Sequence, residues 1–174
     1  MKIKTYSFNK VKSTNDIAFK KIKKQIFLGA IISNKQSHGR GRYGKKWISI
    51  NGNLFMTVFF KINKKIKLKE ITSINCIIIK KAISKYLNKK VIIKEPNDLL
   101  VDNKKICGIL QETFFNNNNK FMVVGIGVNI LDSPSIPKYQ TTYINKYSKK
   151  KINKKLIFHS IKVMFEKNLN KFKN

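Results

Sequence analysis

The chain has 174 residues, long enough for one compact domain with a substantial hydrophobic core. Lys and Arg number 38 against 8 Asp and Glu, so the formal net charge is +30. Such an excess is typical of proteins that bind nucleic acids. Here it consists almost entirely of lysine spread along the chain, which biased base composition in the gene also produces. Composition alone therefore assigns no partner, although weak and salt-sensitive binding to polyanions is expected.

No apolar run approaches the roughly 20 residues that span a bilayer. The N-terminal segment MKIKTYSFNKVKSTND lacks the apolar stretch of a signal peptide. Cys76 and Cys107 lie in apolar surroundings without the close spacing of metal ligands. Free, buried thiols in a reducing compartment fit this pattern. We expect a soluble, cytoplasmic protein with no membrane partner.

Hydrophobic periodicity predicts helices and strands along the whole chain. In chain order we expect a helix at 13–24, a strand at 27–33, a turn at 51–52 leading into a strand that ends near 62, a helix at 69–87, three short strands within 91–115, a strand at 121–130 and a basic amphipathic helix at 154–172. No repeat or linker divides the chain. The sequence therefore predicts an α+β fold, a mixed β-sheet flanked by helices, in one domain spanning 1–174.

Local chemistry predicts where several of these elements begin and end. Ser13 is a suitable N-cap for the first helix, and Asp16 lies three residues later, as in a capping box. Turns are expected at Asn51-Gly52, at Asp102-Asn103 and in the polar run 116–119. These turns would separate successive strands of the mixed sheet.

Residues 36–47, QSHGRGRYGKKW, contain the spacing of two phosphate-binding motifs, G-x-G-x-x-G and G-x-x-x-x-G-K. Both motifs require a helix that opens at the glycines, whereas a strand is predicted next. A P-loop also needs Ser or Thr after its lysine, where Lys46 stands, and a dinucleotide site needs an acid about 20 residues on, where the nearest is Glu70 in a helix. Glycines let a backbone approach a ligand closely, and Arg40 and Arg42 offer planar forks for carboxylate or phosphate. We therefore predict an anion-binding loop of another kind.

Four of the eight acids fall in residues 94–112, KEPNDLLVDNKKICGILQE. Asp98 could hold Mg²⁺ or accept a hydrogen bond, and Lys105 could neutralise a phosphate. Asp98 also suits an ordinary turn after proline, and Lys105 an ordinary surface lysine. Spacing alone leaves both interpretations open.

Taken together, GRGRYGKKW (39–47), the 94–112 segment and GIGVN (125–129), preceded by STN at 13–15, resemble the catalytic domain of biotin–protein ligases. The resemblance covers about residues 13–130, and the motifs are specific because they occur in order. It implies a fold related to class II aminoacyl-tRNA synthetases. It also implies a two-step reaction that uses Mg²⁺. Biotin and ATP give biotinyl-5′-AMP and pyrophosphate, and a lysine of a carrier protein then takes the biotinyl group and releases AMP.

The same resemblance implies roles for individual residues. Lys105 would contact the biotin carboxylate and the α-phosphate, Arg40 would belong to a loop that folds over the adenylate, and Asp98 would lie beside the phosphate and the metal ion. These three are the predicted catalytic residues. The predicted contacts to biotin and the adenylate are Ser13, Thr14, Asn15, Gln36, Gly39, Arg40, Arg42, Lys105 and Gly108. The predicted contacts to the nucleotide are Arg42, Tyr43, Trp47, Asn97 and Asn129.

Three departures from the family pattern qualify this expectation. Glu95 stands where the family has Trp, and it either weakens ligand binding or points to solvent. The motifs begin near residue 13, which leaves no room for the DNA-binding domain of bifunctional members, so no specific DNA partner is expected. We also expect no counterpart of the family's C-terminal SH3-like domain. The expected acceptor is the biotin carboxyl carrier subunit of acetyl-CoA carboxylase, and an exposed sheet edge could pair two copies of the chain into a homodimer.

Two alternatives remain beside this interpretation. Lipoate or octanoate ligases resemble the same fold but use a different glycine-rich loop. A basic nucleic-acid-binding domain without catalysis would expose aromatic rings among its basic residues. The aromatic residues here sit within apolar strands and are expected in the core, namely Phe55, Phe59, Phe60 and Phe121.

Overall fold

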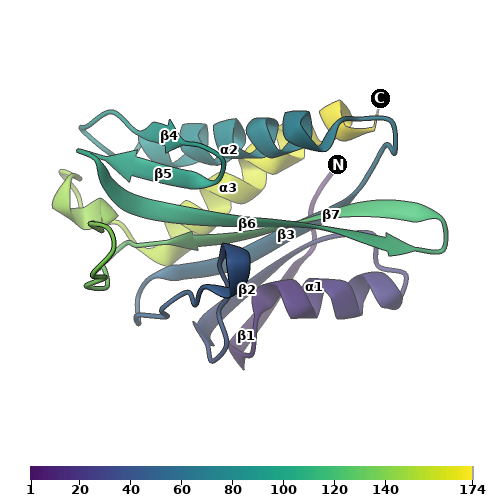
Figure 1. Cartoon of the computed structure of the whole chain (residues 1–174), viewed down its shortest axis with the longest axis horizontal. Coiled ribbons are helices and arrows are strands. Elements are labelled where there is room, and N and C mark those ends of the chain that lie inside the picture. The colour runs from purple at the N-terminus through teal and green to yellow at the C-terminus, as the bar shows by residue number, and fades with distance from the viewer. Residues whose placement is uncertain (174) are drawn as a thin grey trace.

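The computed structural model describes residues 1–173 and shows one β-sheet with helices on both of its faces (Figure 1). The strands are β1 (Thr5–Val11), β2 (Leu28–Gln36), β3 (Leu54–Ile62), β4 (Ile92–Lys94), β5 (Asp98–Val101), β6 (Lys104–Asn116) and β7 (Asn119–Val128). The helices are α1 (Thr14–Lys23), α2 (Leu68–Ser84) and α3 (Lys154–Asn168), with short 3-10 turns η1 (Arg42–Gly44), η2 (Ile144–Lys146) and η3 (Leu169–Phe172).

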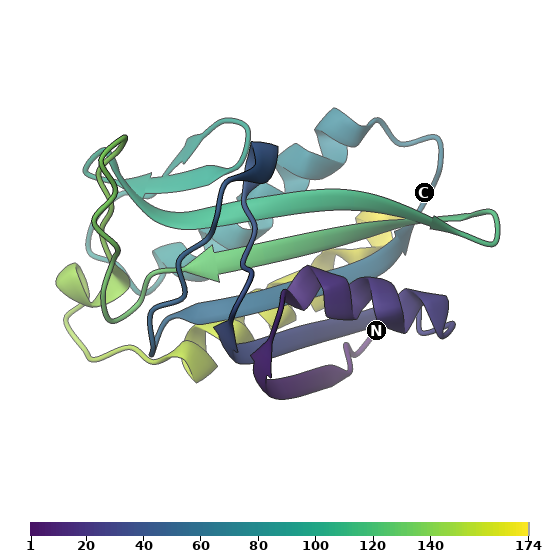
Figure 2. The same ribbon diagram turned by 60° about the horizontal axis from the view of Figure 1, so that its bottom comes forward.

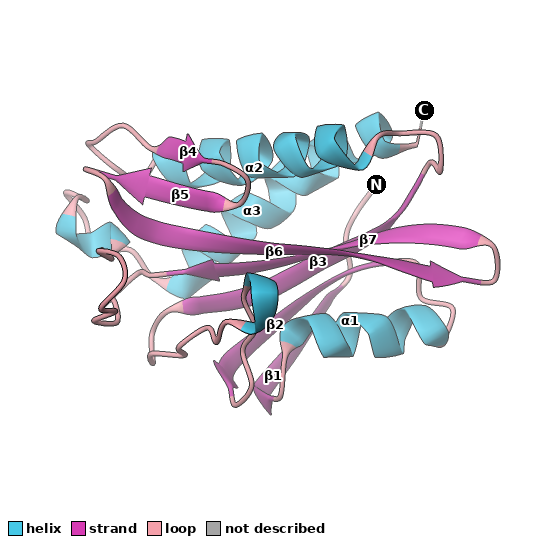
Figure 3. Cartoon of the chain, viewed as in Figure 1, coloured by secondary structure: helices cyan, strands magenta, loops and turns pink. Residues whose placement is uncertain are grey.

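The seven strands lie in the order β1-β2-β3-β7-β6-β5-β4. β1 pairs with β2 in parallel, and every other neighbouring pair is antiparallel. Helix α1 makes the parallel connection from β1 to β2 possible, because a parallel pair cannot be joined by a hairpin. Figure 3 shows the resulting layers. The predicted mixed sheet flanked by helices is confirmed.

Two hydrophobic cores fill the space on the two faces of the sheet. The larger lies under α2 and α3 and includes Ile79, Ile161 and Phe165. The smaller lies under α1, where Ala18 and Ile22 pack against the other face of β2, β3 and β7. All four phenylalanines predicted as core are at most 2% exposed. These four rings therefore cannot serve as the exposed stacking platform that a nucleic-acid-binding domain would need.

The predicted turns are present where side-chain chemistry favours them. Asp102 and Asn103 both have positive φ, of 47° and 60°, in the β5–β6 hairpin. Asn117 and Asn118, with φ of 43° and 59°, close the β6–β7 hairpin. Two consecutive residues with positive φ match the twist of antiparallel strands, and Asn and Asp tolerate this conformation well.

Two features near the N-terminus differ from the sequence prediction. Strand β1 was not predicted, because its exposed edge position leaves it without an apolar run, and its pairing with β2 is not local. The capping box is wrong. Ser13 takes the N-cap position, but its side chain makes no capping hydrogen bond, and the Asp16 carboxylate bonds to Arg40 instead.

Cys76 and Cys107 are buried and free, as predicted. Among the helices that the structure describes, none is both long enough and apolar enough to cross a lipid bilayer.

Candidate functional site

A cavity of about 390 Å³ opens on the α1 side of the sheet. Figure 2 shows the segment between β2 and β3 crossing over β7 and β6. Residues of this segment from Arg40 to Trp47 line one side of the cavity. The start of α1, the end of β2, the β4–β6 region, β7 and the segment after β7 also contribute lining residues. Twelve predicted site residues line this cavity: Ser13, Thr14, Asn15, Gln36, Arg40, Arg42, Tyr43, Trp47, Asn97, Asp98, Lys105 and Gly108.

Two predicted site residues do not line the cavity. Gly39 closes the base of the loop, because its carbonyl accepts a 2.9 Å hydrogen bond from the Trp47 amide. Asn129 is 2% exposed, and its side chain donates to the Thr142 carbonyl at 3.1 Å. Both residues therefore hold neighbouring segments in place.

Lys105 and Asp98 form an ion pair in the cavity wall. The Lys105 Nζ lies 2.8 Å from the Asp98 Oδ1, with side-chain exposures of 14% and 25%. The Asp98 Oδ1 is itself buried and makes no hydrogen bond of good geometry with a described group. The Lys105 Nζ also lies 5.6 Å from the centre of the Trp47 ring and 5.2 Å from that of Tyr139, within range of cation–π attraction. These contacts place in the cavity an ammonium group that is paired with a single carboxylate.

Sequence reasoning missed the segment that follows β7. The Lys105 amide donates to the Gln140 carbonyl, and the Thr142 amide donates to the Lys105 carbonyl, both at 2.9 Å. This pairing brings Lys138, Tyr139 and Gln140 to the cavity. The segment has no periodicity in the sequence, so only its two prolines could be interpreted, and they indicated no more than a break.

The Trp47 indole lies against the sheet where two strands carry glycine. A Cβ on Gly127 would fall 2.3 Å from the ring, and one on Gly108 would fall 2.5 Å from it. Real Cβ contacts are longer, so only glycine leaves room for this ring position. The Trp47 Nε1 is buried and makes no hydrogen bond with a described group. A ligand acceptor or an ordered water at this point would satisfy it.

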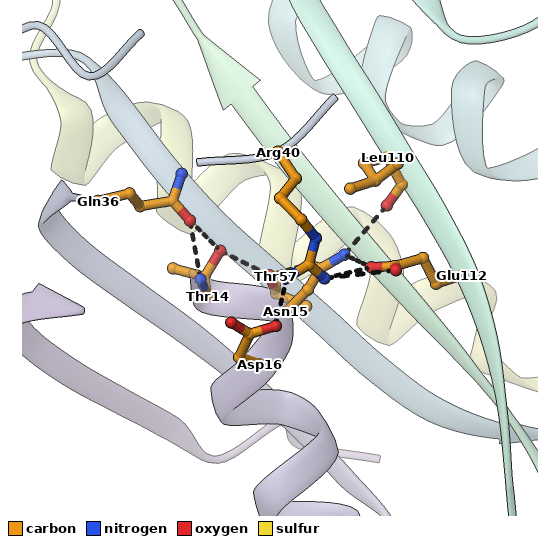
Figure 4. Close-up of polar contacts among 8 residues, drawn as sticks. All are labelled: Thr14, Asn15, Asp16, Gln36, Arg40, Thr57, Leu110 and Glu112. Carbon is orange, nitrogen blue, oxygen red and sulfur yellow. Dashed lines mark hydrogen bonds and ion pairs between the residues drawn. The ribbon is translucent and has the colours of Figure 1, made fainter. Parts of the chain in front are cut away.

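A polar network joins the start of α1 to β2 and β3 (Figure 4). The Gln36 Oε1 accepts from the Thr14 amide at 2.8 Å and lies 3.0 Å from the Thr14 hydroxyl. The Thr57 hydroxyl contacts the Thr14 hydroxyl at 2.8 Å and the Asn15 Oδ1 at 2.6 Å. The Asn15 Nδ2 donates to the Glu112 carboxylate at 2.6 Å. Thr57 and Glu112 were not predicted as site residues, because their partners are distant in sequence.

The Arg40 guanidinium lies between two carboxylates. It donates to Asp16 on α1 and, at 3.1 Å, to Glu112 on β6 (Figure 4). Burial opposes the charge on Arg40, but the hydrogen bonds and charges of Asp16 and Glu112 outweigh it, so the pKa of Arg40 is raised. Arg40 therefore stays a cation whose charge is fully matched within the protein.

Arg42 has a different environment from Arg40. Its guanidinium donates to the Tyr43 hydroxyl at 2.8 Å and to the Asn97 Oδ1 at 3.4 Å, and both partners are neutral. Tyr43 itself is 86% exposed. The cavity is also lined by lysines with no ion pair to a described carboxylate, namely Lys45, Lys46, Lys94 and Lys138. The cavity therefore presents net positive charge to a bound anion.

Glu95, the predicted departure at the aromatic position, is exposed and does not line the cavity. Of the two outcomes open from the sequence, the structure shows the side chain in solvent. The negative charge of Glu95 is thus kept out of the cavity wall.

The described residues do not build a resident metal centre. They contain no group of three or more His, Cys, Asp or Glu side chains that could hold an ion. Asp98 is the one carboxylate among the cavity-lining residues, and Lys105 already pairs with it. A Mg²⁺ ion that arrives on phosphate groups needs only one or two protein carboxylates, and Asp98 suits that lesser role.

Comparisons with known proteins extend this description. Residues 7–129 match the Biotin/lipoate A/B protein ligase family. The chain is 28% identical to the bifunctional ligase/repressor BirA of Bacillus spizizenii over 144 residues, which are 79% of this chain and 44% of that protein. The chain spans less than half the length of the curated relatives that it matches.

Two solved structures are similar over almost the whole chain. Biotin protein ligase from Leishmania major in complex with biotinyl-5-AMP has a TM-score of 0.80 and 24% identity, and covers 97% of this chain and 79% of that one. Biotin protein ligase from Aquifex aeolicus in complex with biotin and ATP has a TM-score of 0.77 and 25% identity, and covers 97% and 71%. The fold is therefore the one these ligases use.

Proposed function

Because the chain belongs to the Biotin/lipoate A/B protein ligase family, we propose that it activates biotin with ATP and transfers the biotinyl group to a carrier protein. The first step gives biotinyl-5′-AMP and pyrophosphate, and the second gives biotinyl-lysine and AMP. The observation that carries this proposal is Lys105, held in the cavity wall by Asp98 and flanked by Trp47 and Tyr139.

The first step brings two anions together. A carboxylate oxygen of biotin attacks the α-phosphorus of ATP, and the bond from that phosphorus to the leaving pyrophosphate breaks. The site must supply positive charge and alignment for this step. Lys105 and Arg42 would supply the positive charge, because Lys105 pairs with only one carboxylate and Arg42 with none. Lys45 and Lys46 in the same wall would reinforce it.

The ureido ring of biotin needs partners that both donate and accept hydrogen bonds. Thr14, Asn15 and Gln36 offer such groups from one side of the cavity. Ser13, 3% exposed and without a capping bond, would contribute its hydroxyl there. Gly108 leaves the room for the ring of Trp47 above it.

The nucleotide would occupy the side of the cavity formed by Tyr43, Trp47 and Asn97. Asn129 would act on it indirectly, because its side chain holds Thr142 and hence the segment that carries Tyr139. If Mg²⁺ enters as part of MgATP, Asp98 is the cavity-lining carboxylate that would hold it.

The second step requires an amine to lose a proton. The lysine nitrogen of the acceptor attacks the carbonyl carbon of the mixed anhydride, and the bond to AMP breaks. Asp98 would accept the proton, because it is the one carboxylate among the described residues that line the cavity. The acceptor we propose is the biotin carboxyl carrier subunit of acetyl-CoA carboxylase, modified in the cytoplasm. No specific DNA partner is proposed, and pairing of two copies through a sheet edge stays a prediction.

The test is adenylate formation from labelled substrate. Purified protein would be incubated with Mg²⁺ and α-labelled ATP, with biotin, with lipoate or with neither acid. We expect labelled adenylate with biotin only. The variant Lys105→Ala should abolish it, whereas Lys104→Ala, one residue away and outside the cavity lining, should not. Adenylate that forms with lipoate and not with biotin would instead assign the chain to the lipoate ligases of this family. No adenylate from folded protein would contradict the proposal.

A further inference from the structure

We propose that Asp16 and Glu112 are positioning residues that hold Arg40, and through it the loop of residues 39–46, and that Arg40 does not bind the substrate anion itself. This inference rests on the proposed function for its kinetic consequence, but its structural part stands alone. It reassigns Arg40, which the family resemblance placed among the catalytic residues.

The three residues come from three parts of the fold. Asp16 lies in the first turn of α1, Arg40 in the loop after β2, and Glu112 in the middle of β6. Arg40 is 24 residues from one partner and 72 from the other along the chain. A planar guanidinium can bind two carboxylates at once with fixed geometry. Arg40 therefore ties the loop to both the helix and the sheet (Figure 4).

The loop has its own backbone ladder, which this tie anchors at one end. The Trp47 amide donates to the Gly39 carbonyl, and the Gly41 amide donates to the Lys45 carbonyl. Arg40 and Lys46 lie opposite each other in an isolated antiparallel bridge. Fixing Arg40 thus fixes a small hairpin whose tip carries Arg42.

Arg40 and Arg42 differ in the charge of the groups that they contact. Arg40 carries one positive charge and lies between two carboxylates, so the three groups together have a net charge of −1. A substrate carboxylate or phosphate would be repelled there. Arg42 contacts only neutral groups and keeps its full charge for a ligand. The two arginines therefore have different roles: Arg40 holds the loop, and Arg42 faces the anion.

Glu112 also fixes a group on the ligand side of the cavity. An ionised carboxylate only accepts hydrogen bonds, so the Asn15 Nδ2 must face Glu112, and its Oδ1 must face the Thr57 hydroxyl. The Asn15 side chain also lies against Gly125, where a Cβ would fall 2.5 Å from its Oδ1. Glu112 thus sets both the loop and the orientation of the Asn15 amide.

The structural part is tested without any substrate. Hydrogen exchange of peptides spanning 39–47 would be followed by mass spectrometry in the wild type, Asp16→Asn, Glu112→Gln and the double variant. We expect exchange in the loop to rise about fivefold in the double variant. Asp102→Asn, which removes a carboxylate from a surface ion pair at a hairpin tip, is the matched control and should leave the loop unchanged. Unchanged loop exchange in the folded double variant would overturn the inference.

The KM for biotin should rise or fall in the double variant according to the role of Arg40. If Arg40 positions the loop, the double variant should raise the KM for biotin about tenfold, and adding Arg40→Ala should change it little further. If Arg40 binds the anion directly, removing its carboxylates frees its charge, and the KM for biotin should fall, which overturns the proposal. Absence of adenylate in the wild type would contradict the proposed function instead, and the exchange experiment would still decide the positioning role. Asp16→Asn alone, at a half-exposed helix position, keeps the test valid if Glu112→Gln does not fold.

Discussion

The indole ring of Trp47 lies directly over Gly127, so close that a Cβ on this residue would fall 2.3 Å from the ring. Because real contacts of this kind are longer, Gly127→Ala should displace the ring from the floor of the cavity. We expect adenylate formation to fall by about tenfold or more.

Trp47 is the one tryptophan in the sequence, so its emission reports the displacement directly. Gly41→Ala is the matched control, since the nearest atom to its Cβ would be at an ordinary 3.4 Å. An unchanged emission spectrum in Gly127→Ala would show that the ring does not depend on this glycine.

Asp98→Asn should separate the two steps of the proposed reaction. The substitution keeps the Lys105 ammonium and an amide oxygen beside it but removes the proton acceptor, so adenylate should still form. Transfer to the carrier should slow by roughly a hundredfold. Single-turnover measurements of each step, starting the second from preformed adenylate, test this expectation. Equal slowing of both steps would instead assign Asp98 to holding Lys105.

Asn53 is a buried residue whose loss should destabilise the fold. Its Oδ1 accepts from the Ile130 and Leu131 amides at 2.8 and 3.1 Å, and its Nδ2 donates to the Asp132 carbonyl at 2.8 Å. Asn53→Ala leaves these groups unsatisfied, so the free energy of unfolding should fall by about 2–4 kcal/mol. Urea denaturation measures it. Asn34→Ala, at an exposed position, should change it by less than about 0.5 kcal/mol.

Stability should fall in alkaline solution because of the buried thiols. Burial, with smaller effects of the Asp98 and Glu95 charges, raises the pKa of Cys76 to about 11. The unfolded chain loses this proton near pH 8.5. The stabilisation is therefore complete below pH 8.5 and is lost progressively as the pH rises towards 11.

Serine does not ionise in this range, so Cys76→Ser provides the comparison. The difference in unfolding free energy between the wild type and this variant should shrink by about 2 kcal/mol from pH 8 to pH 10.5. A constant difference would contradict the raised pKa.

Features set by local chemistry were predictable from the sequence. The positive-φ turn at Asp102-Asn103 is one, because few side chains tolerate that backbone. The motifs also predicted which residues share a cavity, including Lys105 and Gln36, although these are far apart in the chain. This grouping came from the resemblance to biotin–protein ligases, because spacing alone left the role of Lys105 open.

Features set by pairing between distant segments were not predictable. The edge strand β1 depends on a parallel partner that no local pattern reveals. The two carboxylates around Arg40 could be found only once α1 and β6 were placed beside the loop. Tyr139 reaches Lys105 from a segment without periodicity, so its contribution needed the fold as well.

The backbone bonds that join Lys105 to Gln140 and Thr142 have a thermodynamic consequence. A ligand that contacts Tyr139 would order the segment after β7. Through these bonds it would also restrain Lys105, which we propose contacts the second ligand. Coupling of this kind is reciprocal, because each ligand changes the affinity for its companion by one shared factor. Biotin and ATP should therefore bind cooperatively, each lowering the dissociation constant of the other to the same extent.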